Sequence, residues 1–334
     1  MHRTRKPTPL PITQSQCQLS CRRCRCRSAK MTREKIDVHQ CYGSACELAP
    51  QCWPVLSTVI DKYQTESTIM ERCCRCLRFA IRCVGKQAAH LLEPLVKQMV
   101  SVYTRHPHSC LLYLGSILVD EYGSETSCVA GLLEMLQTFI TTTFSLLQEE
   151  NGLKNHPDTV DDFFRLCNRF LLRAPVVFLT APVFPSILQC GLMAVQLDHR
   201  DANSSVMKFF SDMVHAGVSH PEREDFTARQ QLVREMLAEH GRTLVNNLIH
   251  ASVFCLHSYM LCDVAMVITE LILWDRETFR SWIWETLSQL PKQNTGGSVT
   301  ATEKQLMEFQ DTVTNAQNVK IITHSLRDFA RLYR

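Results

Sequence analysis

Apolar residues recur every three or four positions from about residue 48 to the end of the chain. This spacing is typical of helices that bury one face. It predicts helices over residues 49–63, 66–84, 87–105, 108–121, 127–149, 158–173, 184–197, 202–217, 227–256, 262–273, 276–289, 301–314 and 317–332, with glycines and prolines between many of them. The alternation typical of strands is nearly absent. Its one contender, residues 176–179, is flanked by prolines, which argue against a central strand.

The predicted helices follow one another as pairs, about one pair for every 40 residues. Repeats of the HEAT type have about this length, roughly 40–47 residues. We therefore expect an all-α fold in which residues 47–334 form an α-solenoid of about six or seven HEAT-type helix pairs, each burying its apolar face against its neighbours. A single globular helical domain is the alternative.

The helix predicted around residues 71–86 has an unusual distribution of charge. At about 100° per residue, Arg72, Arg75, Arg78 and Arg82 share an arc of roughly 120°. The opposite side is expected to carry Cys73, Cys76, Leu77, Ala80, Ile81, Cys83 and Val84.

The four arginines have few potential partners on their own helix. Glu71 is the nearby acidic residue, whereas a solvated helix face normally mixes charges of both signs. Four like charges on one face repel one another, which favours a binding site for an anionic ligand. A merely solvated basic face is the simpler alternative.

Charge is divided unevenly along the 334 residues. Residues 1–46 hold ten Lys or Arg and two Asp or Glu, a net of +8, whereas the remainder holds 26 basic and 31 acidic residues, a net of −5. A general nucleic-acid-binding protein would be basic over a wide face, so we expect no direct nucleic-acid binding. No apolar run long enough for a transmembrane helix is visible, and we expect no membrane insertion.

The 17 cysteines are spread over apolar runs and a distinct N-terminal segment. Without a secretion signal, they indicate reduced thiols rather than disulfides. Residues 1–46 have no hydrophobic period and are expected to be disordered. They also contain a loosely zinc-like set, Cys17, Cys21, Cys24, Cys26, His39, Cys41 and Cys46, whose spacing is poor for zinc. We therefore expect no metal and no cofactor.

Five segments, in the same order along the chain, resemble segments of a known protein family. They are Glu71–Lys86, Leu112–Gly123, Asn155–Asp162, Leu197–Asn203 and Leu326–Arg334. Together they resemble the C-terminal third of the transportin-SR receptors, nuclear import receptors of the importin-β family, from about Leu48 to the end. Residues 1–46 have no recognised counterpart.

This resemblance implies a binding protein and not an enzyme. It implies cargo proteins with phosphorylated arginine–serine (RS) domains, as in SR splicing factors, and assigns the phosphoserine contacts to Arg72, Arg75, Arg78 and Arg82. It further implies nucleoporins as partners and a location in cytoplasm and nucleus, passing the nuclear pore. The small GTPase Ran is a partner of the family, and we expect its main site to lie in N-terminal repeats that are missing here.

The cargo's own arginines would need acidic partners, for which Asp120, Glu121, Asp161 and Asp162 are candidates. Two other functions stay open. The chain could be a scaffolding or competitor protein that holds cargo without Ran-dependent release. Less favoured is an RNA-binding helical-repeat protein, because one-base-per-repeat patterning is absent.

Overall fold

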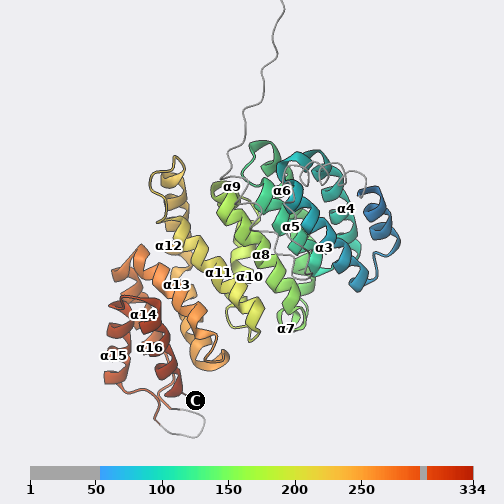
Figure 1. Cartoon of the computed structure of the whole chain (residues 1–334). Coiled ribbons are helices and arrows are strands. Elements are labelled where there is room, and N and C mark those ends of the chain that lie inside the picture. Colours follow the sequence, from blue (N-terminus) through green and yellow to red (C-terminus); the bar gives the residue numbers. More distant parts are fainter. Residues whose placement is uncertain (1–52, 294–298, 334) are drawn as a thin grey trace, which may run out of the picture.

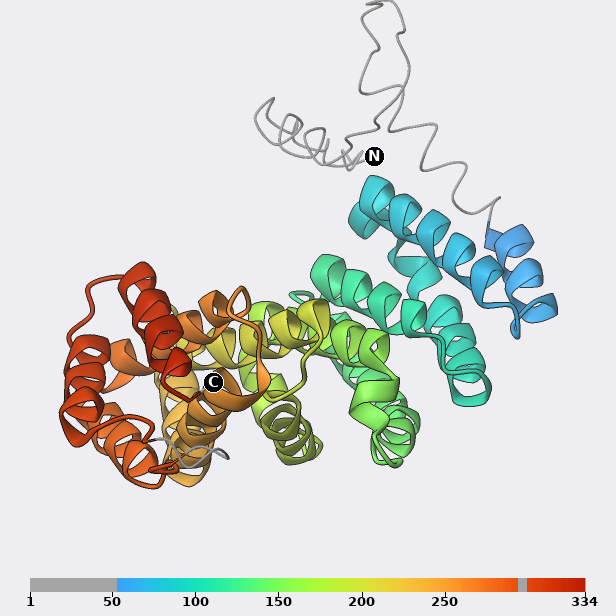
Figure 2. The same cartoon turned by 90° about the horizontal axis from the view of Figure 1, so that it is seen from below.

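The computed structural model describes residues 53–293 and 299–333, and within these ranges helices account for nearly all regular structure. The described residues contain no β-strand, only an isolated antiparallel bridge between Gln293 and Val299. The helices follow one another as an elongated, curved array (Figures 1 and 2). The all-α solenoid expected from the sequence is confirmed. The expected segment 1–46 and its zinc candidates lie outside the described residues.

The array has two layers of helices. In the first, which we call the α3 layer, each helix packs against the next: α3 (Ser67–Val84), α5 (Ser109–Tyr122), α8 (Pro157–Arg173), α11 (Arg200–Ala216), α13 (Leu261–Trp274) and α16 (Val319–Arg331). The second contains a helix over residues 53–62, α4 (Leu92–Arg105), α6 (Thr126–Leu147), α9 (Pro175–Leu179), α10 (Phe184–Ala194), α12 (Phe226–His250), α14 (Arg276–Ser288) and α15 (Glu303–Thr314). Across the described residues the α3 layer holds six helices and the second layer holds eight.

Aromatic rings run through the core from one pair to the next. Phe144 of α6 meets Phe163 of α8 edge-on, with centroids 5.8 Å apart. Phe163 meets Phe164 at 5.3 Å, and Phe164 meets Phe209 of α11 at 5.3 Å. Such pairs add about 0.5–1.5 kcal/mol each beyond the burial of their area. These contacts join neighbouring pairs into one core and so fix the spacing of the α3 layer.

The elements differ from the predicted pattern in four places. The helix predicted over 87–105 begins only at Leu92, because a 3₁₀ segment, η1 (Gly85–Leu91), follows α3. Gly85 has φ +59°, a conformation that glycine adopts without strain. The predicted helix 227–256 ends as a π-helical turn, η2 (Ala251–Cys255). The strand contender is helix α9, with Pro175 in its first turn, and a further short helix, α7 (Gly152–Asn155), was not predicted.

Helix α6 is long and apolar enough to cross a membrane, by length and composition alone. In this structure it packs along α4 and α5 and buries Leu132, Met135, Leu136, Phe139, Ile140, Thr143 and Leu147. Its apolar character therefore contributes to the solenoid core.

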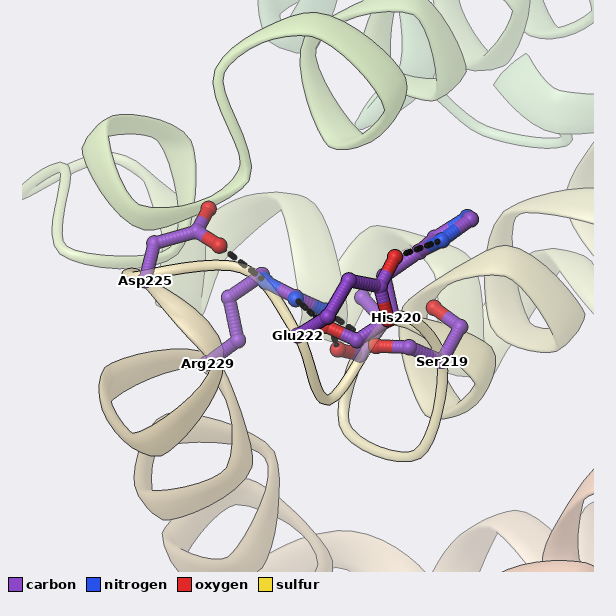
Figure 3. A network of polar contacts seen from close by, with 6 residues as sticks. Ser219, His220, Glu222, Asp225 and Arg229 are labelled. Carbon is purple, nitrogen blue, oxygen red and sulfur yellow. Dashed lines mark hydrogen bonds and ion pairs between the residues drawn. The ribbon is translucent and has the colours of Figure 1, made fainter.

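A buried arginine holds the loop between α11 and α12 (Figure 3). Arg229 is only 2% exposed, and its guanidinium donates to the carbonyl oxygens of Ala216, Ser219 and His220 and to the carboxylate of Asp225. The carbonyl of Ala216 belongs to the last turn of α11, whose terminal carbonyls lack partners within the helix. Arg229 therefore ties the end of one helix to the start of the next.

Candidate functional site

Helix α3 presents the four predicted arginines on its outer side. It buries Met70, Cys73, Cys74, Leu77, Ile81 and Val84 against the rest of the solenoid. Arg72, Arg75 and Arg82 are exposed, whereas Arg78 is half-buried at the edge of the packed face. The structure thus brings the four residues onto one helix surface, which we call the α3 arginine face.

The α3 arginine face has no carboxylate partner among the described residues. None of its four guanidinium groups lies in an ion pair there. Several arginines elsewhere are paired, among them Arg173 with Asp120 at 2.7 Å, Arg242 with Glu285 at 2.8 Å and Arg280 with Asp311 at 2.6 Å. The charge of this face is therefore available for an external anion.

Arg78 differs from its three neighbours because it is held by aromatic rings. Its guanidinium carbon lies 4.8 Å from the ring centroid of Phe79 and 5.5 Å from that of Tyr113 on α5, and its Nη1 donates to Tyr113 Oη at 3.3 Å. Its Nε is buried without a hydrogen-bond partner. Arg78 is fixed in place beside three exposed arginines. The contact with Tyr113 could not be predicted from helical spacing, because it joins residues 35 positions apart.

The apolar side predicted for α3 was wrong at two cysteines. Cys76 is exposed and Cys83 is only partly buried. The buried residues lie at roughly 100–200° when Arg72 is set at zero, whereas Cys83 and Cys76 fall at roughly 20° and 40°, beside Arg72. Phe79 also lies within the arginine arc and is 51% exposed. The α3 arginine face therefore has an apolar component.

Two of the acidic residues expected to serve cargo arginines are already engaged within the chain. Asp120 accepts two hydrogen bonds from Arg173, and Asp161 accepts from Arg165 and from the Ser205 hydroxyl. Burial raises the pKa of Asp162 to about 7, with a further upward contribution from the Asp161 carboxylate. Asp162 is thus a poor partner for an external cation, and Asp120 and Asp161 are balanced by their own arginines.

The buried thiols of the described residues are poor nucleophiles. Burial raises the pKa of Cys73 and of Cys167, and the neighbouring Cys110 and burial together raise that of Cys74. A thiol with a raised pKa is a weak nucleophile. No group of three or more His, Cys, Asp or Glu side chains suited to a metal ion occurs in the described part of the chain.

Comparison with known proteins identifies the class to which this architecture is related. Residues 45–147 match a protein-family model described as the Transportin-3/Importin-13 fourth TPR domain. Transportin MOS14 of Arabidopsis thaliana is 26% identical over 240 residues, covering 72% of this chain and 25% of the relative. Importin-13 of Mus musculus is 22% identical over 181 residues, covering 54% of this chain and 19% of the relative.

The fold comparison agrees with the sequence comparison. A solved structure of importin-13 in its cytosolic state superposes with a TM-score of 0.72 at 14% identity, covering 85% of this chain and 31% of that one. The chain is thus similar in sequence to a transportin and to importin-13, and it shares the fold of importin-13. It spans about a quarter of the length of Transportin MOS14 and about a fifth of that of mouse Importin-13.

Proposed function

We propose that this chain binds phosphorylated arginine–serine-rich segments of cargo proteins through the α3 arginine face, as part of a nuclear import receptor. The observation that carries the proposal is the set of three exposed arginines, Arg72, Arg75 and Arg82, without a carboxylate partner in the described structure. Arg78 completes the set from a fixed position.

The chemistry of arginine suits this ligand. A phosphoserine carries about −1.5 to −2 charges and three acceptor oxygens. The guanidinium group presents a planar fork of donors that fits phosphate oxygens better than an ammonium group does.

The spacing of the α3 arginine face also suits a repeating ligand. Successive turns of α3 rise by about 5.4 Å. An extended Arg–Ser unit spans about 6.5–7 Å, so successive phosphoserines can meet successive turns nearly in step.

The similarity to importins and transportins supports a proposal for the wider role. The chain would act as part of a nuclear import receptor that moves between cytoplasm and nucleus. Ran and nucleoporins would be further partners of that receptor. In this role the chain binds its ligand and catalyses no reaction.

A side-by-side binding measurement tests the proposed function. The ligands are a phosphorylated Arg–Ser peptide, the same peptide without phosphate, and a single-stranded RNA of similar length, each titrated by fluorescence anisotropy. The proposal expects the phosphorylated peptide to bind at least about tenfold more tightly than either of the others, since each charge-assisted hydrogen bond contributes about 1.5–3 kcal/mol. Equal affinity for the two peptides, or a preference for RNA, would contradict it.

A further inference from the structure

A polar groove lies next to the α3 arginine face, between α5, α8 and α11. Its volume is about 240 Å³, where on the same measure one water molecule needs about 10–15 Å³, so it has room for a long side chain. Tyr113 lines the groove and is the residue against which Arg78 packs. The groove and the α3 arginine face therefore form one continuous surface along the α3 layer.

The basic side chains of the groove are balanced by carboxylates of the chain. Arg165 pairs with Asp161 at 2.9 Å and Lys208 with Asp212 at 2.8 Å. Arg169 lies 3.8 Å from Asp120. Arg165 and Lys208 each have a carboxylate partner, whereas Arg169 shares Asp120 with Arg173, so the groove carries less excess positive charge than the α3 arginine face.

Two acceptors in the groove are left without partners. Asp201, in the first turn of α11, is exposed and lies in no ion pair within the described residues. Asn168 of α8 is only 5% exposed, and its Oδ1 has no hydrogen-bond partner in the described structure. Its Nδ2 donates to the backbone carbonyl of Ser205 at 3.3 Å. Because that carbonyl can only accept, the orientation of the amide is fixed and Oδ1 is the free group.

A buried acceptor without a donor costs about 1–3 kcal/mol of free energy, so Asn168 Oδ1 calls for a donor from outside the chain. We propose that the groove binds an arginine side chain of the same peptide whose phosphoserines lie on α3. Its guanidinium would donate to Asp201 and to Asn168 Oδ1. This inference rests on the proposed function, because it assigns a binding site to the positively charged arginines of the same Arg–Ser peptide.

The other groups of the groove suit an arginine stem. Leu172 of α8 lines the groove and is 48% exposed, which offers an apolar surface to the three methylene groups of an arginine. The ring of Tyr113 offers a second flat contact. A phosphate would instead meet the unpaired carboxylate of Asp201, and Asn168 Oδ1 has no proton to donate to it. The groove thus favours the cationic residue of the repeat.

The test is a double-mutant cycle between the chain and its peptide. The protein variants are Asp201→Asn and, as a matched control, Glu303→Gln, which removes an exposed carboxylate at the other end of the array. The probes are a phosphorylated Arg–Ser peptide and the same peptide with every arginine replaced by citrulline, which has the same shape but no charge. Binding is measured by fluorescence anisotropy.

We expect Asp201→Asn to lower the affinity for the arginine peptide by about fivefold or more and to change the affinity for the citrulline peptide little. The reason is that only the arginine peptide loses a charge-assisted contact. Glu303→Gln should change neither by more than about twofold, since screening by salt limits long-range effects. If Asp201→Asn changes the affinities no more than Glu303→Gln does, or raises the affinity for the phosphorylated arginine peptide, the groove does not bind an arginine. The proposed function is tested separately by the Arg72 and Arg75 variants on the same peptides.

Discussion

Arg78 of α3 donates to the hydroxyl of Tyr113 on α5 at 3.3 Å, and its guanidinium covers the ring of that residue. This contact joins the first two helices of the α3 layer. It also divides the four arginines of α3 into two kinds. Three are exposed and free to move toward a ligand, and one is held between two aromatic rings. The same tyrosine lines the groove of α5, α8 and α11.

The first prediction separates these two kinds of arginine. Arg78→Ala removes contacts with two rings and one hydrogen bond, so it should lower the free energy of unfolding by about 1–2 kcal/mol. Arg75→Ala, at an exposed position of the same helix, should change it by less than about 0.5 kcal/mol. Urea denaturation followed by circular dichroism measures both values. Equal effects of the two substitutions would show that Tyr113 does not hold Arg78 in solution.

The second prediction concerns salt. Contacts between exposed guanidinium groups and phosphate are screened over about 8 Å at physiological ionic strength. Affinity for the phosphorylated peptide should therefore fall steeply as sodium chloride is raised, and phosphatase treatment of the peptide should remove most of it. A tight complex that is insensitive to both would instead indicate an apolar contact, for which exposed Phe79 is the nearest candidate on α3.

The third prediction concerns Asp162. Burial raises the pKa of its carboxyl to about 7, and in an unfolded chain it would titrate near about 4. Between these two values the folded state binds more protons than the unfolded state, so the contribution of Asp162 to stability falls as the pH rises through this window. Asp162→Asn removes the buried charge and keeps an oxygen that can accept from the Ser109 hydroxyl.

We therefore expect Asp162→Asn to be more stable than the unmodified chain by on the order of 2 kcal/mol at about pH 8, and the difference to shrink toward about pH 4. Urea denaturation at several pH values measures it. A difference that is constant with pH, or that is larger in acid, would contradict the raised pKa.

The fourth prediction concerns Arg229. Replacing it with Met leaves three carbonyl oxygens of the α11–α12 connection and the Asp225 carboxylate without their buried donor. The free energy of unfolding should fall by about 3 kcal/mol or more, as for other losses of a buried hydrogen-bonded charge. Arg234→Met, at an exposed position of the same helix, is the matched control and should be near neutral. If both substitutions lower the free energy of unfolding equally, the network in Figure 3 contributes little to stability.

The helices of this chain are readable from hydrophobic spacing because nearly every one packs a single face. The predicted helix 66–84 and α3 differ by one residue at one end, and the predicted helix 158–173 and α8 likewise. The misjudged boundaries lie where a local conformation overrides the period. Gly85 ends α3 and begins η1, Pro94 lies in the first turn of α4, and the π turn of η2 continues the apolar run of α12 with a different helical geometry.

The position of the arginines could be predicted for the same reason, since a shared face needs only the helical angle. Their surroundings could not. The burial of Cys76 and Cys83 was misjudged because the packed face of α3 is narrower than half of the helix. The contact of Arg78 with Tyr113, and the meeting of Asn168 with Asp201 in one groove, depend on how separate helices stack. The spacing of residues within one helix does not predict how separate helices pack.

The most direct test of the central claim is the affinity of the phosphorylated Arg–Ser peptide for the Arg72→Ala/Arg75→Ala variant. The control, Arg223→Ala/Arg234→Ala, removes the same charge from exposed positions elsewhere. We predict that the first variant loses affinity at least about tenfold with unchanged helicity, and that the control loses less than about twofold. Equal affinities for the two variants would contradict the claim that the α3 arginine face is the binding site.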